Sequence, residues 1–280
     1  MSPATLDQPA ISPAGTGLPR GRLYRRLRRA VADAALPTGA CGPAVTESDI
    51  AGLPPAAQRY LRFMGVAGRP RDWSFRVRFR GRFRLRPGGA WLPADAWQYN
   101  SAVAPARIFV MRLRLGRLVP LFGRDIYVRG RGHMVGTLFG RKVVDGSGDE
   151  FDHSELVIYL NDAVLLAPSM LLNSATRWTG VDDDSFEMEL ADRGRTVSAR
   201  VRLDEHGAPV NFVADRYATL PQGLVLAPWR TPIQRWETNG NRPMPGQASV
   251  CYDLPTGPHC YAEGQFIRNT IAFNVPPDQL

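Results

Sequence analysis

The sequence has almost no lysine. Lys142 is the only one, so nearly all of the basic charge comes from arginine, and 35 basic against 26 acidic residues give a formal net charge of +9. A charge of this sign favours acidic partners such as nucleic acid or an anionic lipid surface. High-GC coding produces the same arginine bias without any need for arginine's bidentate geometry. We therefore give single arginines little weight as site candidates.

Cysteine is also scarce. Three cysteines are too few for a disulfide scaffold and lack the spacing of a zinc ribbon or finger. If Pro255 and Thr256 centre a hairpin turn, Cys251 and Cys260 face each other on adjacent strands, close enough to form a disulfide. Because no export signal is evident, we favour two free, half-buried thiols in a cytoplasmic protein, with export by an atypical signal as the alternative.

Several functional patterns are missing altogether. No run approaches the ~20 apolar residues that a membrane span requires. The sequence contains no glycine-rich phosphate loop, no G-x-S-x-G elbow, no H-E-x-x-H motif and no dinucleotide fingerprint. We expect no cofactor and no bound metal.

The first 44 residues differ in composition from the rest. Residues 1–44 are rich in Pro, Gly, Ala and Arg, which predicts a largely disordered tail. Within it Leu23, Leu27 and Val31 recur every four residues among arginines and predict a short basic amphipathic helix. A solvated tail helix is the favoured interpretation, and weak contact of residues 20–35 with an anionic membrane is the alternative. A single domain is expected over residues 45–277.

Strict alternation of apolar and basic residues predicts strands from Trp73 onward. The apolar set would face a core and the arginine set, Arg76 to Arg86, would face solvent. The same period returns at residues 91–103, 109–115, 186–190 and 197–203. The aromatic residues lie on the face opposite to the arginines, where they cannot stack on bases, so nucleic acid is not an expected partner. Many such strands joined by turns predict an antiparallel sheet or barrel.

Two segments have helical patterns instead. Residues 53–63 have two prolines near their start, Pro54 and Pro55, and end before Gly65, as a short helix does. Ser147 and Glu150 have the spacing of a capping box, and the apolar residues after them predict a helix that stops before Pro168. A helix this apolar must be buried on most of its surface. We therefore predict a mainly β (α+β) fold, in which a strongly curved antiparallel sheet, or half barrel, holds this helix in or across its concave face.

The stretch Val143–Leu160 has the closest similarity to a known family. It lies within residues 132–171, and together with residues 91–99 and 228–271 this segment resembles an uncharacterised bacterial domain family whose members are similar in architecture to the half-barrel lipoprotein-carrier (LolA-like) proteins. The resemblance runs from about Leu53 to Ile271 and implies the fold, since the family has no established activity to transfer. The family pattern is matched by acidic residues at Asp145, Glu150, Asp152 and Glu155 and by the tyrosine at Tyr159.

Three residues are candidates for acid/base chemistry. Glu155 and Tyr159 lie one turn apart in the apolar helix, where a carboxylate needs a partner. They form either a buried structural pair, which we favour, or a poised acid/base with His133 as a further partner. Asp149 and His153 have a spacing at which two ligands can share a metal, but acidic residues in a first helical turn are explained by the helix dipole.

The function expected first is the binding of a hydrophobic small molecule or lipid in the concavity of the half barrel. Aromatic residues would line that cavity. The alternative is a cofactor-independent enzyme, an isomerase, cyclase or hydrolase, that uses Glu155 on an apolar substrate. The residues predicted to line the cavity are Trp91, Trp97, Tyr99, Trp178 and Trp236.

Overall fold

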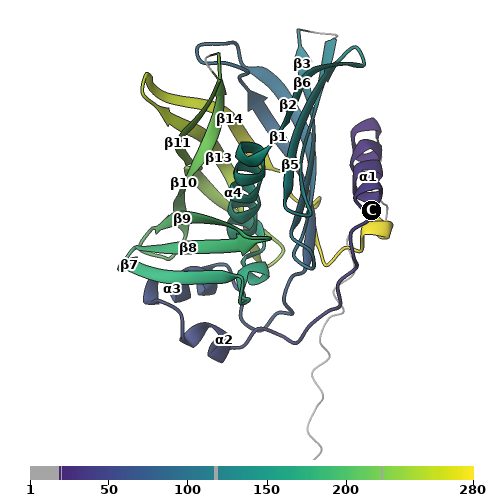
Figure 1. Cartoon of the computed structure of the whole chain (residues 1–280). Helices are drawn as coiled ribbons and strands as arrows, with labels where there is room; N and C mark the ends of the chain where they lie inside the picture. The colour runs from purple at the N-terminus through teal and green to yellow at the C-terminus, as the bar shows by residue number, and fades with distance from the viewer. Residues whose placement is uncertain (1–18, 20, 117–118, 222) are drawn as a thin grey trace, which may run out of the picture.

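The chain folds into one strongly curved, 15-stranded antiparallel sheet with a helix in its concave side (Figure 1). The computed structural model describes residues 19, 21–116, 119–221 and 223–280. Along the sheet the strands run β6-β5-β4-β3-β2-β1-β14-β13-β11-β10-β9-β8-β7, while β12 pairs with β13 and β15 with β1. The strands are β1 Ser74–Phe83, β2 Leu92–Ser101, β3 Ala106–Leu115, β4 Val119–Val128, β5 Arg131–Leu138, β6 Arg141–Ser147, β7 Thr176–Asp182, β8 Ser185–Asp192, β9 Arg195–Leu203, β10 Pro209–Leu220, β11 Gly223–Arg230, β12 Ile233–Asn239, β13 Arg242–Leu254, β14 Gly257–Phe266 and β15 Ala272–Phe273.

The predicted alternation sets the two faces of the sheet. Phe75 and Val77 of β1 are fully buried on the concave side. The arginines within β1 alternate with them, and Arg78 pairs with Asp95 at 2.8 Å. Arg84 and Arg86, beyond the end of β1, line the concave side instead, so the expectation that Arg76 to Arg86 all face solvent is wrong for these two. The predicted mainly β fold with a half barrel is confirmed, and among the described residues the outermost strands β6 and β7 do not pair with each other.

The long helix α4, Asp149–Leu166, lies inside the concavity and confirms the predicted apolar helix (Figure 1). Its buried residues cover every side of the helix, because the sheet wraps around it. The short 3-10 helix η1, Pro168–Leu171, follows it. The predicted capping box at Ser147 is wrong: Ser147 still belongs to β6, and Gly148, with φ of 117°, is the N-cap without a side-chain cap.

Side chains of α4 connect the two outer regions of the sheet. Asp152 accepts a hydrogen bond from the Gly132 backbone N–H of β5 at 2.6 Å and pairs with Arg131 at 2.9 Å. Its other neighbour is Arg195 of β9, at 3.5 Å. We call this set, Arg131, Asp152 and Arg195 together with the Tyr127–Asp192 hydrogen bond of 2.7 Å, the seam. The seam links β4 and β5 to β8 and β9, between which the described residues form no backbone ladder.

The helix α1, Arg22–Ala34, packs on the convex side of the sheet (Figure 1). Its apolar stripe, Leu23, Leu27 and Val31, is buried against β2 and β3. The expected solvated tail helix is therefore wrong for this segment, and any membrane contact by residues 20–35 must use the exposed arginines; that contact stays a prediction. The disorder expected for residues 1–18 lies outside the described residues.

The remaining helices cover one end of the sheet. The short helix α2, Glu47–Ala51, has a complete capping box between Thr46 and Asp49. The helix α3, Pro55–Phe63, confirms the helix predicted over residues 53–63 and packs against β7 and β8.

The last turn, η2 Pro277–Gln279, leads to Leu280, which is buried beside α1, so the packed part of the chain extends past residue 277. Among the described helices none combines the length and the apolar character of a membrane span.

The hairpin of β13 and β14 confirms the predicted placement of two cysteines. Cys251 pairs in register with Cys260 across the turn at Pro255 and Thr256. The favoured interpretation of two free thiols is wrong, because the structure joins them in a disulfide. Cys41 is free and exposed.

Candidate functional site

A cavity of about 350 Å³ lies between the sheet and α4. This volume falls within the usual range of small-molecule sites, about 300–1,000 Å³. Leu85, Leu224 and Leu254 also line the cavity, and Leu85 and Leu224 are exposed while Leu254 is buried. Apolar side chains make up most of its walls: Phe79, Phe83, Phe109, Met111, Leu113, Leu121, Val250 and Phe266.

The inward set of β3 shows how the sequence builds the wall. Phe109, Met111 and Leu113 line the cavity, while Ile108 and Val110, which alternate with them, pack in the cluster beneath α1 on the convex side. Strand alternation alone produces both sets. Because both faces of this strand are covered, its apolar content is higher than that of a half-exposed strand.

The floor of the cavity is polar. Arg107 of β3 donates from Nε to Asp162 of α4 at 2.7 Å and from its terminal nitrogen to Glu155 at 3.1 Å. Arg216 of β10 reaches Glu155 from the other side at 3.4 Å. Gln98 adds a hydrogen bond of 2.7 Å to Asp162. The two guanidinium groups and the two carboxylates therefore neutralise each other, as buried charges must.

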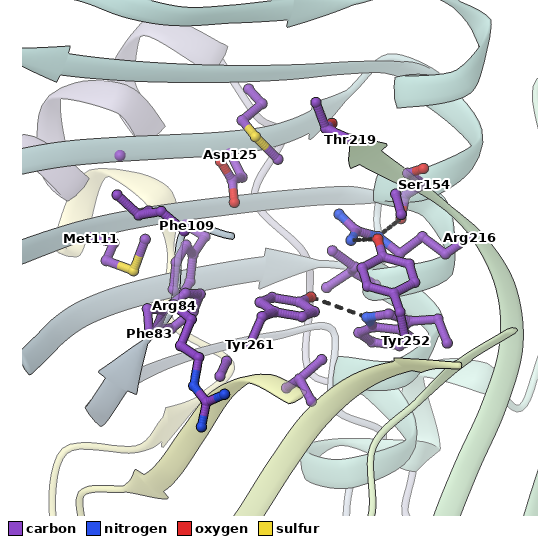
Figure 2. Close-up of a pocket in the computed structure, with 18 of the residues that line it drawn as sticks. Phe83, Arg84, Phe109, Met111, Asp125, Ser154, Arg216, Thr219, Tyr252 and Tyr261 are labelled. Atoms are coloured by element: carbon purple, nitrogen blue, oxygen red, sulfur yellow. Dashed lines mark hydrogen bonds between the residues drawn. The ribbon is translucent and has the colours of Figure 1, made fainter. Parts of the chain in front are cut away.

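Two tyrosines continue this polar floor (Figure 2). The Arg216 guanidinium donates to the hydroxyl of Tyr252, which donates to the Tyr217 carbonyl at 2.8 Å. Trp229 donates from Nε1 to the hydroxyl of Tyr261 at 3.0 Å. Burial raises the pKa of both Tyr252 and Tyr261. These hydroxyls remain protonated donors near neutral pH.

Asp125 of β4 differs from the other acidic residues of the cavity. Its side chain points into the cavity between Phe109 and Thr219 in Figure 2, where no hydrogen bond is drawn to it. Burial, reinforced by the Glu155 carboxylate, raises the pKa of Asp125 to about 7, against the opposing effect of Arg107 and Arg216. Sequence reasoning missed this residue, although alternation from Leu121 through Asp125 would have placed an acid on a core-facing side.

The three residues predicted for acid/base chemistry do not come together. Glu155 is fully buried and held by two arginines, outside the cavity lining. Tyr159 is 2% exposed in the apolar core. His133 lies on β5, where its Nε2 is 2.7 Å from Asp145. In the described part of the chain Glu155 bonds to Arg107 and Arg216 and not to Tyr159, so neither the predicted pair of Glu155 and Tyr159 nor the predicted acid/base group is formed.

The five aromatic residues predicted to line the cavity also lie elsewhere, which corrects the ligand-binding assignment. Trp97 and Tyr99 are on the convex face under α1, with Tyr24 at 4.8 Å from Trp97 between ring centroids. Alternation in β2 turns Gln98, not its aromatic neighbours, toward the cavity. The other three pack on surfaces away from the cavity: Trp91 against Arg82 and Arg84, Trp178 against Tyr60 and Phe186, and Trp236 against Phe63.

The residues considered as a metal pair are otherwise engaged. Asp149 lies 3.3 Å from Arg195, and His153 lies 2.9 Å from the Asp215 carbonyl. Across the described ranges, no cluster of three His, Cys, Asp or Glu side chains is positioned to hold a metal ion.

Comparison with known proteins gives distant structural neighbours and one family. A DUF1329 family protein from Desulfovibrio piger has 13% identity and a TM-score of 0.40, with 79% of this chain and 92% of that chain covered. A LolA superfamily protein from Nitrosomonas europaea has 12% identity and a TM-score of 0.35, with 77% and 92% covered. At such values neither neighbour carries an argument about ligand or activity, and the half-barrel assignment rests on the strand order of this chain.

The family match is direct. No curated protein matches the sequence. Residues 43–264, most of the chain, match a family model, which confirms the predicted membership in an uncharacterised family. The chain belongs to the family of unknown function DUF6544.

Proposed function

We propose that this protein binds a hydrophobic small molecule or lipid in the cavity between the half barrel and α4. The observation that carries the proposal is the apolar cavity of about 350 Å³ with a polar floor. Burying apolar surface of a ligand against such walls contributes about 25 cal/mol per Å² before the costs of association are subtracted. A site with apolar walls and few polar groups is typical of a small-molecule pocket.

The enzyme alternative has less support. It depended on Glu155, which is enclosed by Arg107 and Arg216 and does not line the cavity. A general acid or base must reach the proton that it transfers, at about 2.6–3.2 Å or through one water. Glu155 serves instead to hold the two arginines of β3 and β10 against α4.

The proposal is tested by measuring binding of the neutral apolar dye Nile red to the full-length protein by fluorescence. We expect saturable binding that is weakened at least tenfold by Val250→Trp, because Val250 lines the cavity and a larger side chain there fills it. Val103→Trp is the matched control, since Val103 is 45% exposed outside the cavity. Absent dye binding, or equal loss in both variants, would overturn the proposal.

Native mass spectrometry of the same protein gives an independent readout. A copurifying apolar molecule is expected in the wild-type protein and should be depleted in the Val250→Trp variant. Retention of the same molecule by both would place its site outside the cavity.

A further inference from the structure

Two residues that line the cavity beside its neutralised floor carry polar groups for which the described residues supply no hydrogen bond. The Asp125 carboxylate makes no hydrogen bond to another residue drawn in Figure 2. Asn161 of α4 also lines the cavity and is only 4% exposed. Its Oδ1 is buried without a hydrogen-bond partner among the described residues. Leaving a buried polar group unpaired costs about 1–3 kcal/mol, so such groups are expected to have a partner.

The strand register brings these two residues to the same part of the cavity. Asp125 of β4 is the direct partner of Phe109 on β3, two residues from Arg107. Arg107 in turn binds Asp162, the neighbour of Asn161 on α4. The unpaired groups therefore flank the place where β3 contacts α4.

Charge limits what can bind there. Arg107 and Arg216 are already paired with Glu155 and Asp162, so the floor offers no unneutralised cation to an anionic ligand. Arg84 and Arg86 also line the cavity, but they follow the end of β1, and the Arg84 guanidinium lies 4.1 Å over the Trp91 ring. A cationic ligand would be repelled by the same two guanidinium groups, which are close enough to act electrostatically on Asp125. Removing an ionic group from water without a counter-charge is far costlier than removing a hydroxyl.

We propose that the bound molecule has an apolar body and an uncharged hydroxyl-type end, and that Asp125 and Asn161 hydrogen-bond to this end. This inference rests on the proposed function and names the ligand class of the same cavity. The hydroxyl donates to Asn161 Oδ1 and accepts from the Asp125 carboxyl when that group is protonated. When Asp125 is ionised, the hydroxyl donates to it instead.

The test is competition with Nile red by four probes of equal chain length: octan-1-ol, octanoate, octylammonium and octane. We expect octan-1-ol to compete at least tenfold more strongly than either ion. Asp125→Leu and Asn161→Leu should each weaken octan-1-ol binding about fivefold, the equivalent of one ordinary hydrogen bond. Both variants should leave octane binding unchanged or improved.

Controls separate this inference from the proposed function. Asp125→Asn, which keeps a donor and an acceptor, should retain octan-1-ol binding within twofold, and Asp183→Leu in the exposed β7–β8 turn should have no effect. Thermal unfolding of each variant establishes that it folds. Equal or stronger binding of an ion, or unchanged octan-1-ol binding in both leucine variants, would overturn the inference while Nile red binding upheld the cavity. Loss of Nile red binding from the wild-type protein would instead remove the proposed function.

Discussion

Arg107 and Asp162 form a buried ion pair between β3 and α4, with Nε 2.7 Å from Oδ2. Both side chains are at least nine-tenths buried, and Arg107 also contacts Glu155. The pair holds α4 at a fixed position along β3, because it joins a residue in the C-terminal half of the helix to the sheet.

Substitution of Arg107 should lower the stability of the folded protein. Arg107→Leu leaves two buried carboxylates without their shared partner, and we expect a loss of about 3–5 kcal/mol in the free energy of unfolding, measured by urea denaturation. Arg112→Leu, the same change on the same strand, removes a contact with Asp95 at 3.4 Å in which the arginine is 41% exposed. Its expected cost is below about 1 kcal/mol. Similar costs for the two variants would contradict the structural role of the buried pair.

Asp125 should make stability depend on pH. Its folded-state pKa of about 7 lies above the ordinary value of 3.8, so the folded protein retains a proton that the unfolded chain releases between these values. The stability contributed by this group is fully present below about pH 4 and is lost as the pH rises to about 7, with a slope of at most about 1.4 kcal/mol per pH unit.

Asp125→Asn removes this titration. Relative to the wild type, the variant should therefore gain stability between about pH 4.5 and pH 8, measured by urea unfolding at each pH. Asp183→Asn on the exposed turn is the control. A constant difference between wild type and Asp125→Asn across the pH range would show that Asp125 titrates normally.

The hairpin disulfide predicts a simple thiol count. Without reductant the denatured protein should expose one reactive thiol, Cys41, and with reductant three. Replacing both Cys251 and Cys260 by serine should lower the free energy of unfolding by about 2 kcal/mol, the low end for a disulfide because the loop that it closes is short. Cys41→Ser should leave stability unchanged. Three reactive thiols before reduction would contradict the bond.

The docking of α1 can be tested by limited digestion with trypsin, which cleaves after its many arginines. Leu27 is fully buried against the sheet. Leu27→Ala should weaken docking by about 2 kcal/mol or more and speed cleavage within residues 22–34. Arg28→Ala, on the exposed side of the same helix, should not. Equal cleavage rates for wild type and Leu27→Ala would show that the helix is not held by this contact.

The sequence predicts the fold better than the site. Alternation in β1 and the continuous apolar pattern of α4 are local features, so the half barrel and its central helix follow from them. The docking of α1 does not, because the stripe of Leu23, Leu27 and Val31 would look the same on a solvated helix, a membrane surface or a sheet. Which surface covers it is a long-range property of the chain.

The residues that line the cavity could not be predicted from the sequence for a related reason. Large aromatic side chains at Trp97 and Tyr99 indicated an interior, and they do face one, but it is the interior beneath α1. With two buried faces on one strand, residue type no longer tells which face is the cavity. Asp125 and Arg107 are polar residues on the cavity side, which alternation could identify only once the inner face was known.

The seam has a mechanical consequence for the half barrel. Because β6 and β7 share no ladder in the described part of the chain, side chains such as Asp152 and its two arginines span the gap between the two wings of the sheet. Asp152 is only 1% exposed, so solvent and salt screen its two ion pairs less than they screen surface pairs. Because β5 and β9 are joined here through α4, a substitution at this one position removes contacts to both wings of the sheet at once.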